Sequence, residues 1–309
     1  MPFTANTVNE INTAAQQPVE FIATEENRYY SEILNIAEQI AANDDTKIVS
    51  IAGPSSSGKT TTAHILCDCL KKLGETPTVV SLDDFYLSDE FLPILPNGKK
   101  DIESVNALNI DLLNKCFNEI ITTGKTLLPR FDFVNKKSIL SDRYVDISNH
   151  GIIIAEGLHA LNPIITDLIP RKNIFKAYIS VNCSIMDNFG EQLLSSRQIR
   201  LVRRSLRDRI FRGTSVNETL SLWNGVVDGE RKYLYCFKNT ADVHIKTLHK
   251  YEPCIYRDEF LKLKDEISKT SVCYDYFMRT ANAIEKFDSF DSKYVPSCSL
   301  IREFIGNGY

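Results

Sequence analysis

The chain has 309 residues, of which 43% are hydrophobic, so it can form one large α/β domain with additions or two smaller domains. Its formal net charge of −4 at pH 7 does not favour nucleic acid or an anionic membrane as a partner. No apolar run approaches the ~18–20 residues of a membrane span, and the N-terminus lacks the basic start and apolar core of a signal peptide. We therefore expect a cytoplasmic protein that binds small anions locally.

The cysteine pattern predicts reduced, mostly buried thiols. The eight cysteines include one C-x-C pair and no C-x-x-C pair. Cys67 and Cys69 are two positions apart on a predicted helix, so they point to different faces and make a poor metal clamp.

Predicted strands alternate with predicted helices along the chain. Residues 25–43 carry apolar residues at helical spacing and predict a leader helix, and residues 61–74 predict a second helix that Gly74 ends. The predicted strands are 46–52, 76–82, 151–157, 174–181 and 241–246. Such alternation with unbroken apolar strands favours a parallel sheet of about five strands covered by helices on both faces, with ligands at its C-terminal edge.

The most specific motif is G-P-S-S-S-G-K-T at residues 53–60, which matches the phosphate-binding P-loop and lies between a predicted strand and a predicted helix. Glycines let backbone N–H groups turn toward phosphate oxygens, a lysine supplies a positive charge, and a threonine offers Mg²⁺ an oxygen. The motif predicts a nucleoside triphosphate with Mg²⁺ as the ligand. The expected nucleotide-binding residues are Gly53, Ser55, Ser56, Ser57, Gly58, Lys59, Thr60 and Thr61.

An acid pair follows the second predicted strand, in S-L-D-D-F-Y-L at residues 81–87. Successive strand residues face opposite ways, so only one of Asp83 and Asp84 can point into a cleft beside the P-loop. The other interpretation is that both are solvated residues of a turn.

A further carboxylate, Glu156, ends the predicted strand 151–157. An acid in that place can hold Mg²⁺ or its waters, whereas the alternative is a carboxylate that interacts with a helix dipole. His159 follows three residues later, either as a packed or capping side chain or as a substrate contact.

Residues 197–213 contain seven arginines and no lysine. Arg197, Arg200, Arg204 and Arg207 fall at helical spacing and share one face. A solvated basic face is one interpretation. Guanidinium groups suit phosphate oxygens, so we favour a lid that closes over the triphosphate.

Together, G-P-S-S-S-G-K-T-T, S-L-D-D-F-Y, P-R-F-D-F (129–133), A-E-G-L-H-A-L-N-P and the arginine segment resemble the uridine kinase and phosphoribulokinase family. Residues 212–243 are similar to that family's region after the lid. Residues 295–306 resemble the C-terminus of bacterial nucleoside kinases related to uridine kinase, which often carry an N-terminal domain related to threonyl-tRNA synthetase that is absent here. The resemblance implies a P-loop NTPase fold over residues 46–250, preceded by a tail and leader helix (1–45) and followed by a helical extension packed on it (251–309).

The resemblance also implies roles for individual residues, with ATP and Mg²⁺ as cofactors. Asp83 is the catalytic base, Lys59 binds phosphate, and Thr60 and Glu156 place the metal. Arg204 contacts the nucleoside, and Arg207 and Arg212 are lid arginines that assist catalysis. The acid that holds the ribose hydroxyls is Glu103 or Asp101.

Two positions depart from the pattern of pyrimidine-specific uridine kinases, because Phe131 and Lys136 stand where those enzymes have tyrosine and histidine. Phe131 and Phe133 either stack on a base or are core aromatics, so we expect weak base selectivity. The expected reaction is transfer of the γ-phosphoryl group of ATP to the 5′-hydroxyl of a nucleoside. A kinase of another small polyol and a non-catalytic nucleotide-binding regulator are the alternatives, and a homo-oligomer is left open.

Overall fold

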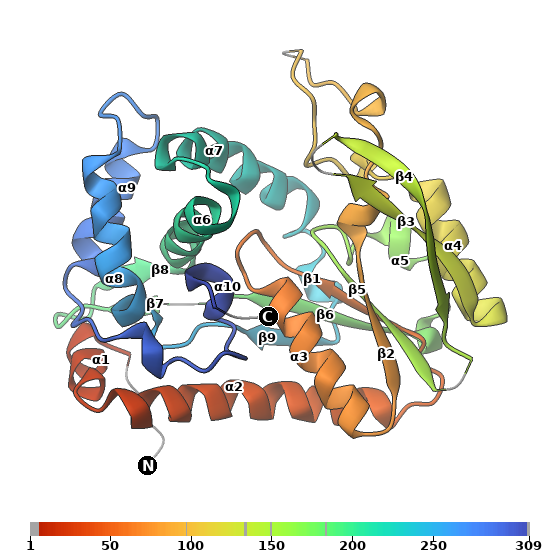
Figure 1. The fold of residues 1–309 in the computed structure, drawn as a ribbon, viewed down its shortest axis with the longest axis horizontal. Helices are drawn as coiled ribbons and strands as arrows, with labels where there is room; N and C mark the ends of the chain where they lie inside the picture. The colour runs from red at the N-terminus through yellow and green to blue at the C-terminus, as the bar shows by residue number, and fades with distance from the viewer. Residues whose placement is uncertain (1–5, 97, 133–134, 149, 183, 308–309) are drawn as a thin grey trace.

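The computed structural model describes residues 6–96, 98–132, 135–148, 150–182 and 184–307. Its centre is a five-stranded sheet in which every neighbouring pair is parallel (Figure 1). In spatial order the strands are β2 (Thr76–Ser81), β5 (Gly151–Glu156), β1 (Ile48–Ala52), β6 (Ile174–Ser180) and β9 (Val243–Lys246). The sequence-based prediction of an α/β fold with these five strands is therefore confirmed.

The two faces of the sheet are buried in two separate hydrophobic clusters. On β5, Ile152 and Ile154 belong to one cluster, whereas Ile153 and Ala155 belong to the other. Alternate strand residues point to opposite faces, so an unbroken apolar strand is the expected solution for a sheet covered on both sides. The pairing register brings the C-terminal ends of three strands side by side, because Ser81 of β2 and Ile51 of β1 both lie opposite Glu156 of β5.

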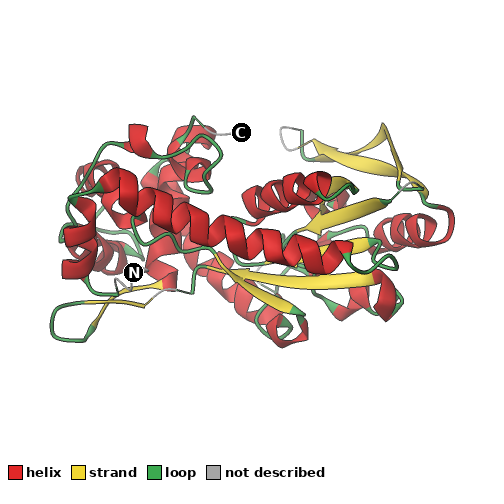
Figure 2. Cartoon of the chain, turned by 90° about the horizontal axis from the view of Figure 1, so that it is seen from below, coloured by secondary structure: helices red, strands yellow, loops and turns green. Residues whose placement is uncertain are grey.

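The first cluster is covered by helices from both ends of the chain. Helix α2 (Pro18–Ala41) packs against α3 (Lys59–Lys72) and runs along the side of the molecule that Figure 2 shows. The sequence predicts the leader helix over residues 25–43. The observed helix α2 ends close to the predicted C-terminus but begins earlier, at Pro18, and α1 (Val8–Ala15) precedes it. The same cluster also includes buried side chains of α6 (Ser196–Arg212), α7 (Val216–Tyr233), α8 (Glu252–Lys262), α9 (Tyr274–Ile284) and α10 (Arg302–Ile305).

The second cluster is covered by α4 (Ile110–Thr123) and α5 (Pro163–Thr166). Beside it lies an antiparallel hairpin of β3 (Lys125–Asp132) and β4 (Lys137–Asp146), which the sequence analysis did not predict. A smaller hairpin joins β7 (Ser184–Met186) to β8 (Gln192–Ser195) before α6.

The seven cysteines that the structure describes are all free, and five of them are buried, as the sequence predicted. Among the described residues, no helix is both long and apolar enough to cross a membrane.

Candidate active site

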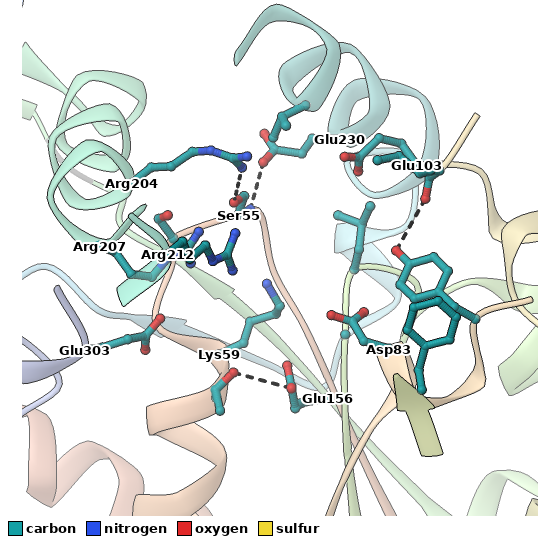
Figure 3. Close-up of a pocket in the computed structure, with 18 of the residues that line it drawn as sticks. Ser55, Lys59, Asp83, Glu103, Glu156, Arg204, Arg207, Arg212, Glu230 and Glu303 are labelled. Carbon is teal, nitrogen blue, oxygen red and sulfur yellow. Dashed lines mark hydrogen bonds between the residues drawn. The ribbon is translucent and has the colours of Figure 1, made fainter. Parts of the chain in front are cut away.

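A cavity of about 840 Å³ lies at the C-terminal edge of the sheet, beside the loops that follow β1, β2 and β5 (Figure 3). Helices α6 and α7 and the short helix α10 complete its wall. The predicted residues that line it are Ser55, Ser56, Gly58, Lys59, Thr60, Asp83, Glu103, Phe131, Lys136, Glu156, Arg204, Arg207 and Arg212. The structure thus gathers residues from distant parts of the chain around one space.

The P-loop has the tight backbone that phosphate binding requires. Ser56 and Gly58 have φ values of 57° and 89°, and α3 begins at Lys59 directly behind them. At Gly53, a Cβ atom would lie 2.6 Å from the carbonyl oxygen of Ile179, so only glycine fits there. Because Gly58, Lys59 and Thr60 line the cavity, the N-terminus of α3 lies beside it, and the first N–H groups of a helix have no partner within the helix, as at other anion sites.

Not every P-loop residue borders the cavity. Gly53, Ser57 and Thr61 are absent from its lining. The Thr61 hydroxyl instead donates a hydrogen bond of 2.7 Å to Glu303, which does line the cavity and which the sequence analysis missed.

Two arginines of α6 hold the P-loop from outside. The Arg200 Nε donates a hydrogen bond to the carbonyl oxygen of Ser55 (2.8 Å). The Ser55 N–H donates to Glu230 Oε1 (2.8 Å), and Glu230 in turn forms an ion pair with Arg200. Arg203 is fully buried and forms a bidentate ion pair with Glu252 of α8, with N–O distances of 2.7 and 2.9 Å. Its Nη1 also donates to the carbonyl oxygen of Ser56 at 3.4 Å. These contacts fix the loop and rule out a solvated basic face for this part of the helix.

Arg209 is exposed and pairs with Glu266, and the other four arginines of α6 divide into two groups. Arg197 lies over the ring of Tyr276, 5.2 Å from its centre, and is not part of the cavity. Arg204, Arg207 and Arg212 line the cavity and converge on the buried Asp208, with N–O distances of 3.3, 3.1 and 3.4 Å. The four arginines at helical spacing therefore do not act as one set. A closing movement of α6 stays a prediction.

Only one member of the acid pair faces the cavity, as predicted, although both residues lie in a 3₁₀ helix (Leu82–Phe85) that follows β2 and not in the strand itself. Asp84 turns away from the cavity, where Arg143 of β4 donates to it at 3.1 Å and the Phe131 N–H donates at 3.4 Å. Asp83 lines the cavity. Although its side chain is exposed to the cavity, the surrounding protein displaces water and raises its pKa, while the charge of Lys59 lowers it in part. Only Asp83 is placed to act on a ligand.

Glu156 lies at the bottom of the cavity and is nearly buried. The Thr60 hydroxyl donates to its Oε1 at 3.4 Å, as Figure 3 shows. Burial raises the pKa of Glu156 to about 7, against the opposing charge of Lys59. A hydroxyl and a carboxylate suit Mg²⁺, which takes few protein ligands and keeps several waters. Among the described residues, no three His, Cys, Asp or Glu side chains form a complete metal site by themselves.

The raised pKa of Glu156 predicts a pH effect on stability. A carboxyl whose pKa is higher in the folded state, here about 7 against an ordinary 4.5, stabilises the fold at low pH and loses that contribution as pH rises from about 4.5 to 7. In metal-free buffer, the melting temperature of Glu156→Gln is expected to rise relative to wild type over this range. Thermal unfolding at pH 5, 6 and 8 tests this, and a constant difference between the two proteins contradicts it.

The far end of the cavity, beyond Asp83, combines an acid with aromatic rings. Glu103 reaches it because Gly229 of α7 leaves room: a Cβ atom there would lie 2.7 Å from the Glu103 Cβ. Burial raises the pKa of Glu103 to about 7, and Arg204 opposes the shift. The rings of Phe131 and Tyr86 meet edge to face at 5.7 Å, and both line the cavity.

Of the remaining predicted site residues that the structure describes, one lines the cavity and two do not. Lys136 lines the cavity at the hairpin turn with a φ of 51°. Asp101 accepts a hydrogen bond from Tyr233 at 3.2 Å and does not line the cavity. His159 is also outside the lining; it is buried beside the Tyr233 ring, and burial lowers its pKa to about 4. Phe133 lies outside the described residues.

The parallel sheet and its P-loop define a P-loop NTPase fold. The phosphoribulokinase / uridine kinase family model matches residues 48–252, so the chain belongs to that family. Family membership supports a phosphotransferase that uses ATP and acts on a small molecule. The match ends at the first residue of α8, so α9 and α10, with Glu303, lie outside it.

Curated relatives include uridine kinases. The chain is 26% identical over 180 residues to uridine kinase of Ureaplasma parvum, which covers 58% of this chain and 77% of that protein. It is 26% identical over 183 residues to uridine kinase of Saccharomyces cerevisiae, covering 58% of this chain and 32% of that protein. A solved structure of a possible uridine kinase from Bacillus stearothermophilus aligns with a TM-score of 0.43 at 18% identity, over 65% of this chain and 89% of that one.

Proposed function

We propose that this protein transfers the γ-phosphoryl group of ATP to the 5′-hydroxyl of a nucleoside. The observation that carries the proposal is one cavity with a P-loop at one end and Asp83, Glu103 and two aromatic rings at the other. The chain's membership in a kinase family and its uridine kinase relatives support the same reading.

The residues at the P-loop end would bind and align the phosphates. Lys59 and the N–H groups at the start of α3 compensate the negative charge of the β- and γ-phosphates. Thr60 and Glu156 would hold Mg²⁺, which adds positive charge at the phosphates when it is bound. Arg207 and Arg212 would strengthen their contacts as charge develops on the transferred group.

The residues at the other end would bind and activate the acceptor. Asp83 accepts the proton of the attacking hydroxyl, and its raised pKa makes it a better base than an ordinary aspartate. Glu103, in its deprotonated form, accepts hydrogen bonds from the ribose hydroxyls. Phe131 and Tyr86 pack against the base without reading its edge.

This pocket predicts shallow selectivity among nucleosides. A site that stacks on a base discriminates less than one whose buried polar groups pair with its edge. We expect kcat/KM to differ by less than about 10²-fold between uridine and at least one purine nucleoside, and 2′-deoxyuridine to be poorer than uridine.

The test is ATP consumption with a panel of uridine, cytidine, inosine, guanosine, adenosine, 2′-deoxyuridine and simple sugars. Exclusion of every purine contradicts the shallow selectivity. Turnover with sugars alone moves the acceptor to another small polyol and overturns the nucleoside assignment.

A further inference from the structure

The C-terminal segment, residues 299–306, forms part of the cavity wall next to the P-loop. Leu300 packs so closely on Gly58 that a Cβ atom there would lie 2.5 Å from Leu300 Cδ1. Three residues later, Glu303 accepts the hydrogen bond from Thr61 and lines the cavity. The start of α3 and residues 299–306 are thus in direct contact.

Several contacts fix this segment in place. The Arg302 guanidinium donates to the carbonyl oxygens of Ser292 (2.9 Å) and Val295 (2.5 Å). Phe304 is buried under the guanidinium of Arg203, 4.9 Å from its ring centre. Glu303 is therefore a carboxylate held on a rigid support rather than a side chain on a loose terminus.

The in-line geometry of phosphoryl transfer indicates which of the two substrates lies next to Glu303. The attacking and leaving oxygens lie roughly in line on opposite sides of the transferred group. Figure 3 shows Lys59 between Asp83 on one side and Glu303 on the other. With the acceptor hydroxyl at Asp83, the leaving nucleoside diphosphate lies on the side of Glu303.

The negative charge of Glu303 indicates which group of the nucleotide it can contact. A carboxylate repels phosphate, and it accepts hydrogen bonds without donating any. On the same side, Arg207 and Arg212 already supply positive charge for phosphates, and Glu303 attracts Arg212. The uncharged hydrogen-bond donors that follow the phosphates along a nucleotide are the ribose hydroxyls.

We infer that Glu303 accepts a hydrogen bond from a ribose hydroxyl of the phosphoryl donor, so that the C-terminal segment selects a ribonucleotide. This inference rests on the proposed function, since it requires a nucleotide donor in the P-loop. It assigns a donor contact to a segment beyond the residues that the family model matches.

Isothermal titration calorimetry with ADP, 2′-deoxy-ADP and 3′-deoxy-ADP in the presence of Mg²⁺ tests the inference without any acceptor. We expect wild type to bind ADP about 10-fold more tightly than one of the deoxy analogues, as hydrogen bonds to charged groups allow. Glu303→Ala should reduce this ratio to below about 2-fold. Glu303→Gln, which keeps an acceptor oxygen, should have an intermediate ratio.

The control variant is Glu266→Ala, which removes an exposed glutamate that pairs with Arg209 away from the cavity. It should keep the wild-type ratio. If Glu303→Ala only loosens the segment, the affinities for ADP and both analogues fall together and the ratio stays unchanged, which overturns the inference. Equal affinities of wild type for all three nucleotides overturn it as well. A wild-type protein that binds no ADP overturns the proposed function together with the inference.

Discussion

Asp83→Asn is expected to lower kcat by about 10²–10⁴-fold while leaving ADP affinity nearly unchanged. The amide cannot accept the proton of the attacking hydroxyl, but it keeps the size of the side chain that lines the cavity. The measurement is steady-state kinetics with the best nucleoside from the panel, combined with calorimetric binding of ADP.

Asp84→Asn is the matched control, because it makes the same chemical change one residue away. It weakens the ion pair with Arg143 of β4, so it should affect the hairpin that carries Phe131 and raise the KM of the acceptor more than it lowers kcat. A larger loss of kcat in Asp84→Asn than in Asp83→Asn would reverse the assignment of the base.

Glu252→Ala is expected to lower the free energy of unfolding by about 3–5 kcal/mol, since it leaves the fully buried guanidinium of Arg203 without its charged partner. Urea denaturation followed by circular dichroism measures this loss. The same substitution at the exposed Glu259 of the same helix, which pairs with Lys262, should cost less than about 1 kcal/mol. A loss below 1 kcal/mol in Glu252→Ala would show that Arg203 finds other partners.

The parts of the fold that follow local patterns could be predicted from the sequence. Most of the five sheet strands contain short apolar runs, of which Ile152–Ala155 in β5 is the clearest, and the P-loop places Gly58 where the backbone needs a positive φ. The β3–β4 hairpin has no such run: its pairing register shifts at Pro129, and only one of its faces is buried, with Leu128 and Val145 in the second cluster and Leu127 and Tyr144 exposed.

The candidate site was predictable wherever a residue directly follows a sheet strand. The separation of Asp83 from Asp84 was expected from strand geometry, but it arises in the 3₁₀ helix Leu82–Phe85 that follows β2. Glu230 and Glu303 were missed because helix packing brings them to the P-loop from positions far along the chain. The different roles of Arg200, Arg203 and Arg197 likewise depend on their neighbours in α7, α8 and α9, which helical spacing alone does not reveal.

The contact between Leu300 and Gly58 also has a consequence for synthesis of the chain. All five sheet strands and the P-loop leave the ribosome before residues 251–306, which cover part of the same hydrophobic cluster. During that interval the apolar side chains that α8, α9 and α10 later bury stay open to water and to chaperones. The nascent chain therefore completes its cavity wall last, when the final turn of helix docks beside a loop made about 240 residues earlier.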